Sequence, residues 1–363
     1  MARPPFHADH VGSLLRPQEL REARAKAKSA QLGATQLRSI EDACIVRAVK
    51  KQEEIGLQSI TDGEFRRDFW HLDFLKQLDG IELVRVQSGH TFNAEDVPPM
   101  ASVTGKVGCS RPIMVEHFAF LRSITKRTPK FTMPSPGTAH MRGGRNAISR
   151  TAYPDLEEFW ADIGAAYRKA IRHLYDAGCR YVQLDDVGFS YLCDDKVREN
   201  FRKNGDDPDT LASAYAGAIN EALRDRPKDL AVTMHTCRGN FRSTWFAAGG
   251  YQDEVVQAMF TAGVDGFFME YDSERAGGFG PLRLLPKGKK VVLGLVTTKS
   301  GALESKDALK RRIDEAAKVV PLENLCLSPQ CGFSSTHHGN LLSEDEQWAK
   351  LARVVDVAAE VWH

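Results

Sequence analysis

The chain has 363 residues, with 49 Lys and Arg against 48 Asp and Glu, a net charge of +1, and 42% hydrophobic residues. This composition is typical of a globular protein and excludes collagen-like, disordered and coiled-coil chains. The balanced charge gives no electrostatic reason to expect a nucleic acid or an anionic membrane as partner. No run of about 18 apolar residues is present, so we expect no membrane-spanning helix.

The cysteine content favours a reducing compartment. Seven cysteines, an odd number, are spread from Cys44 to Cys331, which does not suggest a disulfide framework. The first residues, MARPPFHADHVGS, are too polar for a secretory signal. We therefore predict a cytoplasmic protein.

The first elements along the chain are two predicted helices within residues 17–56. In the second of them, apolar residues recur with roughly the 3.6-residue period of a helix, at Leu37, Ile40, Cys44, Ile45 and Val49. We expect these N-terminal helices to be an addition to the main repeat of the fold.

A repeating unit follows, in which a short apolar run ends in polar residues and an amphipathic stretch comes next. Eight such runs are present: 6–12, 57–64, 130–136, 179–186, 229–237, 264–272, 290–298 and 324–331. The clearest helix candidates between them are 155–177, 209–225, 252–262, 303–319 and 343–360. Strands this apolar, alternating with helices, predict a parallel sheet covered by helices.

Eight strand–helix units favour an α/β fold closed into a (β/α)₈ TIM barrel. Residues 81–110 do not fit the repeat, because they alternate apolar and polar residues at period two. We read them as a β-hairpin inserted before the third barrel strand. Since no linker or composition shift divides the chain, we predict one domain over residues 1–363.

Metal-ligating side chains gather at the predicted carboxyl ends of the strands, where the active sites of such barrels form. His235 and Cys237 are two residues apart on one run, so they point the same way. Glu270 ends the next run, and Cys331 ends the last. Two thiolates with an imidazole favour zinc over magnesium or calcium. The alternative is that these cysteines and this histidine are ordinary core residues.

Several motifs resemble one known family. V-T-M-H-T-C-R-G-N, F-M-E-Y-D and L-S-P-Q-C-G-F occur in that order, after D-H-V-G-S-L-L-R-P and S-I-T-D-G-E-F-R-R-D near the start. They resemble the zinc-binding domain of cobalamin-independent methionine synthases, especially short single-domain relatives. The resemblance implies a (β/α)₈ barrel with Zn²⁺ bound by His235, Cys237, Glu270 and Cys331, and a thiol substrate that ligates the metal. Glu270, the hardest of the four ligands, is the one we expect to loosen when the thiol arrives.

The same resemblance implies a clamp for the amino and carboxylate groups of homocysteine. The matching positions are Val11, Gly12, Ser13, Glu64 and Asp185. Glu64 and Asp185 end the second and fourth runs, where a carboxylate can pair with an ammonium. The alternative is that such carboxylates only cap the helices that follow.

The chain also departs from the family. Residues 133–136 read Met-Pro-Ser-Pro, without the indole that stacks on the folate donor, and no second barrel is present. Lys299 stands near the position of the family's proton-donating histidine. It is a candidate acid or anion anchor, unless it only pairs with Glu304 on the surface. His10, at the end of the first run, is a further catalytic candidate.

The sequence thus predicts a zinc-dependent S-methyltransferase that activates a thiol, homocysteine above all, as a zinc thiolate and forms methionine. Its partners would be that small-molecule thiol and a methyl or alkyl donor, with no nucleic acid or membrane, and the chain is compatible with a homo-oligomer. The alternative within this chemistry is a thiol alkyltransferase acting with another thiol or electrophile, similar to epoxide:coenzyme M transferases. A uroporphyrinogen-type decarboxylase or a non-enzymatic binding protein would leave the four metal-ligating residues unexplained.

Overall fold

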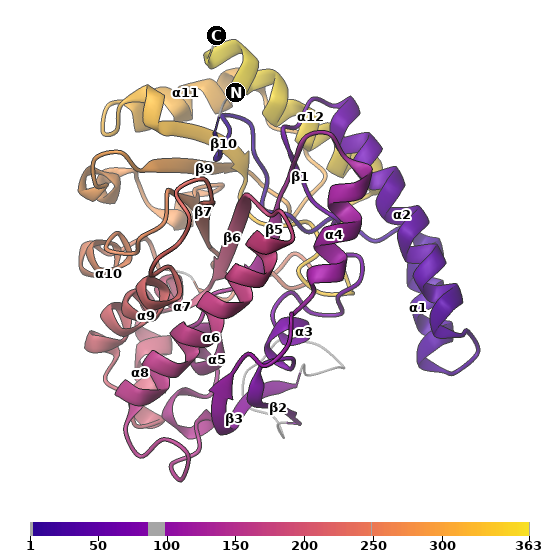
Figure 1. Ribbon diagram of the computed structural model, residues 1–363. Coiled ribbons are helices and arrows are strands. Elements are labelled where there is room, and N and C mark those ends of the chain that lie inside the picture. The colour runs from indigo at the N-terminus through magenta and orange to yellow at the C-terminus, as the bar shows by residue number, and fades with distance from the viewer. Residues whose placement is uncertain (1–2, 86–98, 248, 363) are drawn as a thin grey trace.

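The computed structural model describes residues 3–85, 99–247 and 249–362 (Figure 1). Its strands are β1 (Ser59–Ile60), β2 (Asp79–Val84), β3 (Met100–Gly108), β4 (Thr128–Pro129), β5 (Phe131–Pro134), β6 (Tyr181–Asp186), β7 (Ala231–Thr236), β8 (Gly266–Glu270), β9 (Lys290–Val296) and β10 (Leu325–Pro329). Its α-helices are α1 (Gln18–Lys28), α2 (Ala34–Glu54), α3 (Leu72–Leu75), α4 (Val115–Ile124), α5 (Thr138–Met141), α6 (Leu156–Asp176), α7 (Gly188–Tyr191), α8 (Asp195–Lys203), α9 (Pro208–Ala222), α10 (Asp253–Met259), α11 (Lys306–Ala317) and α12 (Glu344–Val361).

The centre of the fold is a parallel sheet of six strands in the order β10-β9-β8-β7-β6-β5. Strands β5 to β8 and β10 are buried along their whole length, which explains why they read as continuous apolar runs. Helices lie around the outside of these strands in Figure 1, among them α6, α9, α11 and α12. The long helix α6 begins at Asp155, whose side chain accepts a hydrogen bond from Glu157 N. The expected α/β fold with a parallel sheet is confirmed.

The first two predicted strands are largely wrong as strands. Within the described residues, 6–12 make one parallel bridge, between Ala8 and Leu327 of β10, and 57–64 contains the two-residue β1, paired with β4. The reason is the buried Asp9, whose carboxylate accepts hydrogen bonds from the Ser59 and Tyr181 hydroxyls and from Phe6 N and His10 N. These side-chain bonds hold the segment where a ladder of backbone bonds was expected.

Two predicted elements that lie outside the strand–helix repeat, the β-hairpin and the pair of N-terminal helices, are present. Strands β2 and β3 pair antiparallel, with Ile81 opposite Val103 and Val84 opposite Met100, so the predicted hairpin is confirmed; its connecting residues 86–98 lie outside the described part of the chain. Helices α1 and α2 form the predicted pair after the first segment, and they extend from the body at the right of Figure 1.

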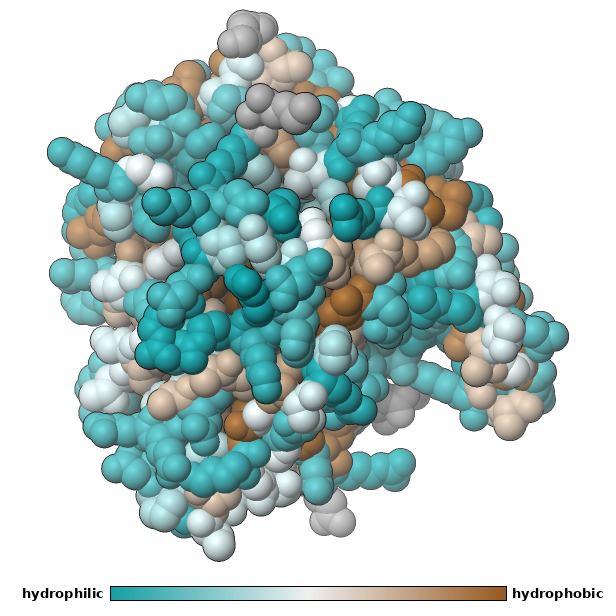
Figure 2. All heavy atoms as spheres, viewed as in Figure 1, coloured by the Kyte–Doolittle hydropathy of each residue, from teal (hydrophilic) through white to brown (hydrophobic). Residues whose placement is uncertain are grey.

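The face seen in Figure 2 is covered mainly by hydrophilic residues, with hydrophobic ones in small separate groups. Within the described ranges, no helix combines the length and the apolar character needed to cross a bilayer.

Candidate metal centre and substrate cavity

The four predicted metal ligands come together at the carboxyl ends of three strands. His235 lies on β7 and Cys237 directly after it, Glu270 is the last residue of β8, and Cys331 follows β10 by two residues. A hydrogen bond from Cys237 N to Asp186 O, 2.7 Å long, fixes the chain where it leaves β7. Parallel strands end at the same edge of the sheet, so three separate sequence segments deliver their side chains to one point.

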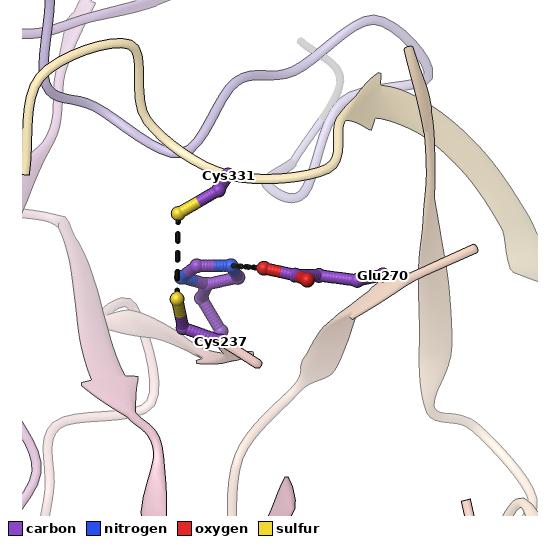
Figure 3. A group of neighbouring side chains, drawn as sticks. Cys237, Glu270 and Cys331 are labelled. Atoms are coloured by element: carbon purple, nitrogen blue, oxygen red, sulfur yellow. Dashed lines mark hydrogen bonds and ion pairs between the residues drawn. The ribbon is translucent and has the colours of Figure 1, made fainter. Parts of the chain in front are cut away.

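The geometry of the cluster suits a tetrahedral ion. One ligand atom from each of the four side chains lies within 4.8 Å of the others, and all four residues are buried. The sulfurs of Cys237 and Cys331 are 3.5 Å apart, and His235 Nε2 is 3.8 Å from Glu270 Oε1. Ligands of a tetrahedral zinc lie about 3.4–3.8 Å from one another. In Figure 3, Cys237, Cys331 and Glu270 point toward a common centre.

The electrostatics of the cluster also favour a cation. Burial raises the pKa of the Cys331 thiol, but hydrogen bonds with Cys237 and His235 outweigh burial and lower this pKa to about 5. Both carboxylate oxygens of Glu270 are buried and lack a hydrogen-bond partner among the described residues. A buried carboxylate without hydrogen bonds is costly, and a metal ion at this point would satisfy it. Two sulfurs, one imidazole and one carboxylate are a donor set that zinc prefers.

Asp185 contacts the ring nitrogen of His235 that faces away from Glu270. The register of β6 and β7 places Asp185 opposite His235, and its Oδ1 lies 3.3 Å from His235 Nδ1. A metal-bound histidine commonly donates its second ring N–H to a carboxylate, which fixes the ring and its tautomer. Gln183 Nε2 donates to the same Oδ1 at 2.6 Å, so Oδ2 is the oxygen that is left for a ligand. Asp185 therefore contacts a predicted metal ligand, His235, in addition to its expected role in the clamp.

Arg275 faces the opposite side of the cluster. Its Nη2 lies 3.6 Å from Glu270 Oε2, slightly beyond hydrogen-bond length. Its Nη1 donates to Ala247 O at 2.7 Å, and its guanidinium lies 4.6 Å from the centre of the Trp245 ring. These contacts hold a cation beside the buried carboxylate.

A cavity of about 430 Å³ opens onto the cluster. His235, Cys237 and Cys331 form part of its wall. Of the predicted clamp residues, the wall includes Val11, Ser13, Glu64 and Asp185. Aromatic side chains complete much of the remaining wall, namely Phe69, Trp70, Tyr191, Phe241, Phe246 and Phe201. The structure thus brings the predicted clamp and the predicted metal ligands to one space.

Glu64 enters the cavity from a strained turn. Its φ is +60°, in the left-handed region that non-glycine residues rarely adopt, and its N–H donates to Asp62 Oδ1 at 2.9 Å. Burial, followed by the nearby Asp185 charge, raises the pKa of Glu64 to about 7, although Arg67 and the Thr132 hydroxyl oppose this shift. Oε1 accepts the Thr132 hydroxyl at 2.7 Å, whereas Oε2 has no hydrogen-bond partner in the described ranges. One carboxylate oxygen therefore remains for a donor from a ligand.

Gly12 shapes the clamp without lining the cavity. Its φ is +137°, and a Cβ there would lie 2.6 Å from Thr132 Cγ2, so only glycine fits. Its neighbour Ser13 accepts a hydrogen bond from Ser334 N through Oγ at 3.3 Å. A Cβ on Gly332 would lie 2.0 Å from that Oγ, so the glycine after Cys331 permits this close approach.

Lys299 and His10 lie outside the cavity wall. The Lys299 ammonium donates to Asn240 Oδ1 and Thr244 O at 3.0 Å each and to Gly239 O at 3.3 Å. The surface pair with Glu304 is wrong: Lys299 is buried, and Glu304 pairs with Lys350 at 3.0 Å. His10 is buried with Nε2 3.1 Å from Ser59 O, and burial, aided by the Lys130 charge, lowers its pKa to about 4.

Sequence reasoning missed Arg275, the Asp185–His235 contact and His71, which also lines the cavity. The only signal for His71 was its place directly after Phe69 and Trp70, behind the D-G-E turn.

Comparison with known proteins extends these observations. The family model for the cobalamin-independent synthase catalytic domain matches residues 6–360. The uncharacterized protein YxjH of Bacillus subtilis is 50% identical over 361 residues, which cover 99% of this chain and 95% of that protein. A 5-methyltetrahydropteroyltriglutamate–homocysteine methyltransferase of Bacillus velezensis is 24% identical; the match covers 96% of this chain and 42% of that enzyme.

Solved structures of similar proteins point to the same family and fold. A candidate vitamin-B12-independent methionine synthase from Listeria monocytogenes has a TM-score of 0.79 and 40% identity, and the match covers 100% of both chains. A B12-independent methionine synthase from Shewanella, solved with selenomethionine, has the same fold, with a TM-score of 0.74 at 19% identity over 97% of this chain and 96% of that one. Because the family model spans nearly the whole chain, this protein belongs to the cobalamin-independent methionine synthase family.

Proposed function

We propose that this protein is a zinc-dependent S-methyltransferase that methylates homocysteine to methionine. The observation that carries the proposal is the buried cluster of His235, Cys237, Glu270 and Cys331, which opens into a cavity where Glu64 Oε2 has no partner among the described residues. A free thiol has a pKa of about 8.5 and is mostly protonated at neutral pH. Zinc held by this cluster would keep the substrate sulfur as a nucleophilic thiolate.

The chain's own residues would then bind and orient the substrate. Glu64 would accept a hydrogen bond from the homocysteine ammonium, and Asp185 would contribute through Oδ2 while its Oδ1 holds His235. The thiol proton would go to solvent when the substrate is bound. The sulfur then forms a bond to the methyl carbon, the bond from that carbon to its carrier atom breaks, and the carrier keeps the electron pair and takes up a proton. We further infer that residues 1–363 act as one domain, since the cavity wall runs from Val11 to Thr336.

A second candidate keeps the thiol chemistry and changes the electrophile. It is favoured by the carboxyl end of β5, where Met133 and Pro134 are buried and residues 133–136 themselves include no aromatic side chain on which a pterin ring could stack. The aromatic wall of the cavity comes instead from Phe69, Trp70 and Tyr191.

One experiment separates the two candidates. Zinc-loaded protein is given homocysteine together with methyltetrahydrofolate (mono- and triglutamate), methylcobalamin or a small epoxide, in parallel reactions. Methionine identified by mass in any methyl-donor reaction supports methyl transfer, and a thioether formed only from the epoxide supports the second candidate. Thiol that is not consumed in any reaction contradicts both.

A further inference from the structure

Gln183 is a fully buried amide that touches two of the predicted clamp residues without lining the cavity. It lies on β6 two residues before Asp185, so the two side chains point to the same face of the strand. Its Nε2 donates to Val11 O and to Asp185 Oδ1, at 2.6 Å each. One side chain thus joins the first segment of the chain to the carboxylate at the end of β6.

The chemistry of its two partners fixes which end of this amide faces them. A backbone carbonyl and a carboxylate that receives donors can only accept hydrogen bonds, so both require the NH₂ end of Gln183. Its Oε1 is then left over, and it is buried without a hydrogen-bond partner in the described part of the chain. An unpaired buried oxygen is unfavourable, and an apolar side chain of the same length would avoid it. The two donated hydrogen bonds therefore point to a role for Gln183 beyond filling the core.

The hydrogen bond from Gln183 determines how the Asp185 carboxylate is turned. Oδ1 accepts this bond and also lies 3.3 Å from His235 Nδ1, so both contacts of the carboxylate within the described ranges fall on one oxygen. Asp185 forms part of the cavity wall, and Oδ2 is the oxygen that can meet a ligand there. Without the N–H groups of Gln183, one long contact to His235 would hold the carboxylate, and its plane would be free to turn.

We propose that Gln183 is a positioning residue that couples the metal ligand His235 to recognition of the substrate's amino group. Its hydrogen bonds hold the Asp185 carboxylate so that one oxygen contacts the imidazole and the other faces the ammonium, and they hold Val11 beside it. Gln183 acts through Asp185 and does not touch the substrate. This inference rests on the proposed function, in which the thiol is an amino acid.

The test compares the binding of two thiols, homocysteine and 4-mercaptobutyrate, which lacks the amino group. Both are titrated calorimetrically into protein that carries one zinc per chain, and the ratio of the two affinities measures recognition of the amino group. Gln183→Met, which has a similar length and no donor, should lower this ratio by about tenfold. Asp185→Asn should lower it as well. Adding Gln183→Met to Asp185→Asn should lower it no further, because the two residues act as one unit.

Thr233→Val is the matched control for a change inside the core. The register of β6 and β7 places Thr233 opposite Gln183, and the residue is equally buried. Its hydroxyl lies 3.5 Å from the Tyr181 hydroxyl and does not reach the clamp. This variant should leave the ratio of affinities unchanged. If Gln183→Met does not fold, Gln183→Leu takes its place, and the result expected for Asp185→Asn alone still holds.

An unchanged ratio in Gln183→Met or in Asp185→Asn would overturn the proposal, even if the variant is less stable. An equal fall of the ratio in Thr233→Val would overturn it too, because the effect would then belong to the core in general. A further fall in the double variant would show that Gln183 acts without Asp185 and would also overturn it. Failure of the wild type to bind homocysteine, or to prefer it to 4-mercaptobutyrate, would instead contradict the proposed function.

Discussion

We expect Glu64 to be the residue that distinguishes a thiol with an amino group from a thiol without one. Glu64→Gln should weaken the binding of homocysteine by about ten- to a hundredfold, because the charge-assisted hydrogen bond from the homocysteine ammonium to the carboxylate is lost. The matched control ligand is 4-mercaptobutyrate, which is homocysteine without its amino group, and its affinity should stay the same. Calorimetric titration of both thiols into the zinc-loaded proteins measures the difference.

The raised pKa of Glu64 adds a pH dependence to this preference. Since burial raises that pKa to about 7, the carboxylate that an ammonium requires forms only as the pH rises through that value. The ratio of homocysteine to 4-mercaptobutyrate affinity should therefore increase from about pH 6 to about pH 8 in the wild type and stay flat in Glu64→Gln. A ratio that is flat in both proteins would mean that Glu64 does not bind the amino group.

Arg275 is placed to receive Glu270 if that carboxylate leaves the metal. The 3.6 Å gap between Arg275 Nη2 and Glu270 Oε2 would close to a hydrogen bond after a small movement. Arg275→Met should lower thiol affinity by about tenfold and leave zinc affinity, measured by chelator competition, unchanged or higher. Equal losses of zinc and thiol affinity would show that Arg275 only supports the site.

At the scale of elements, Lys299 joins the end of β9 to the loop after β7 through its bonds to Gly239, Asn240 and Thr244. Lys299→Met should leave these acceptors unpaired and lower the free energy of unfolding by about 1–3 kcal/mol. Hydrogen exchange in residues 239–244 should accelerate, while the zinc content stays at one per chain. Unchanged stability together with a loss of turnover of about 10²–10⁴ would instead identify Lys299 as an acid.

The elements that could be predicted are those whose environment is uniform along the sequence. Strands β6 to β10 lie between helices on one side and other core residues on the other, so their sequences are largely apolar until polar residues begin near their carboxyl ends. Helix α6 shows its buried face at helical spacing. Residues 6–12 are also predicted to form a strand, but the hydrogen bonds of the buried Asp9 replace the expected ladder. No local pattern reveals the position of a partner such as Tyr181.

In the candidate site, too, some residues could be predicted from the sequence and some contacts could not. The four metal ligands were predictable because each lies at the carboxyl end of a strand or within two residues after it, and parallel strands share one edge. The contacts from Asp185 to His235 and from Arg275 to Glu270 depend on strand register and on side-chain direction. His71 was missed because nothing in the sequence distinguishes a histidine in a cavity wall from one that is paired inside the core, as His140 is.

At the scale of the whole molecule, the metal is expected to be separable from the fold. Cys237→Ser and Cys331→Ser should each abolish tight zinc binding, because a soft thiolate is replaced by a poor neutral ligand. Both variants should keep the circular dichroism spectrum of the wild type, since a core of this size does not depend on the metal. Cys326→Ser, a buried cysteine of β10 that is not a ligand, is the matched control. Full zinc occupancy in either ligand variant would refute the assignment.

We expect the substrate thiol to bind the metal held by His235, Cys237, Glu270 and Cys331. Zinc K-edge X-ray absorption tests it most directly, because sulfur neighbours at about 2.3 Å are distinguished from nitrogen and oxygen neighbours at about 2.0–2.2 Å. We expect two sulfur ligands in the zinc-loaded protein and three after homocysteine is added. Two sulfurs in both samples would contradict it.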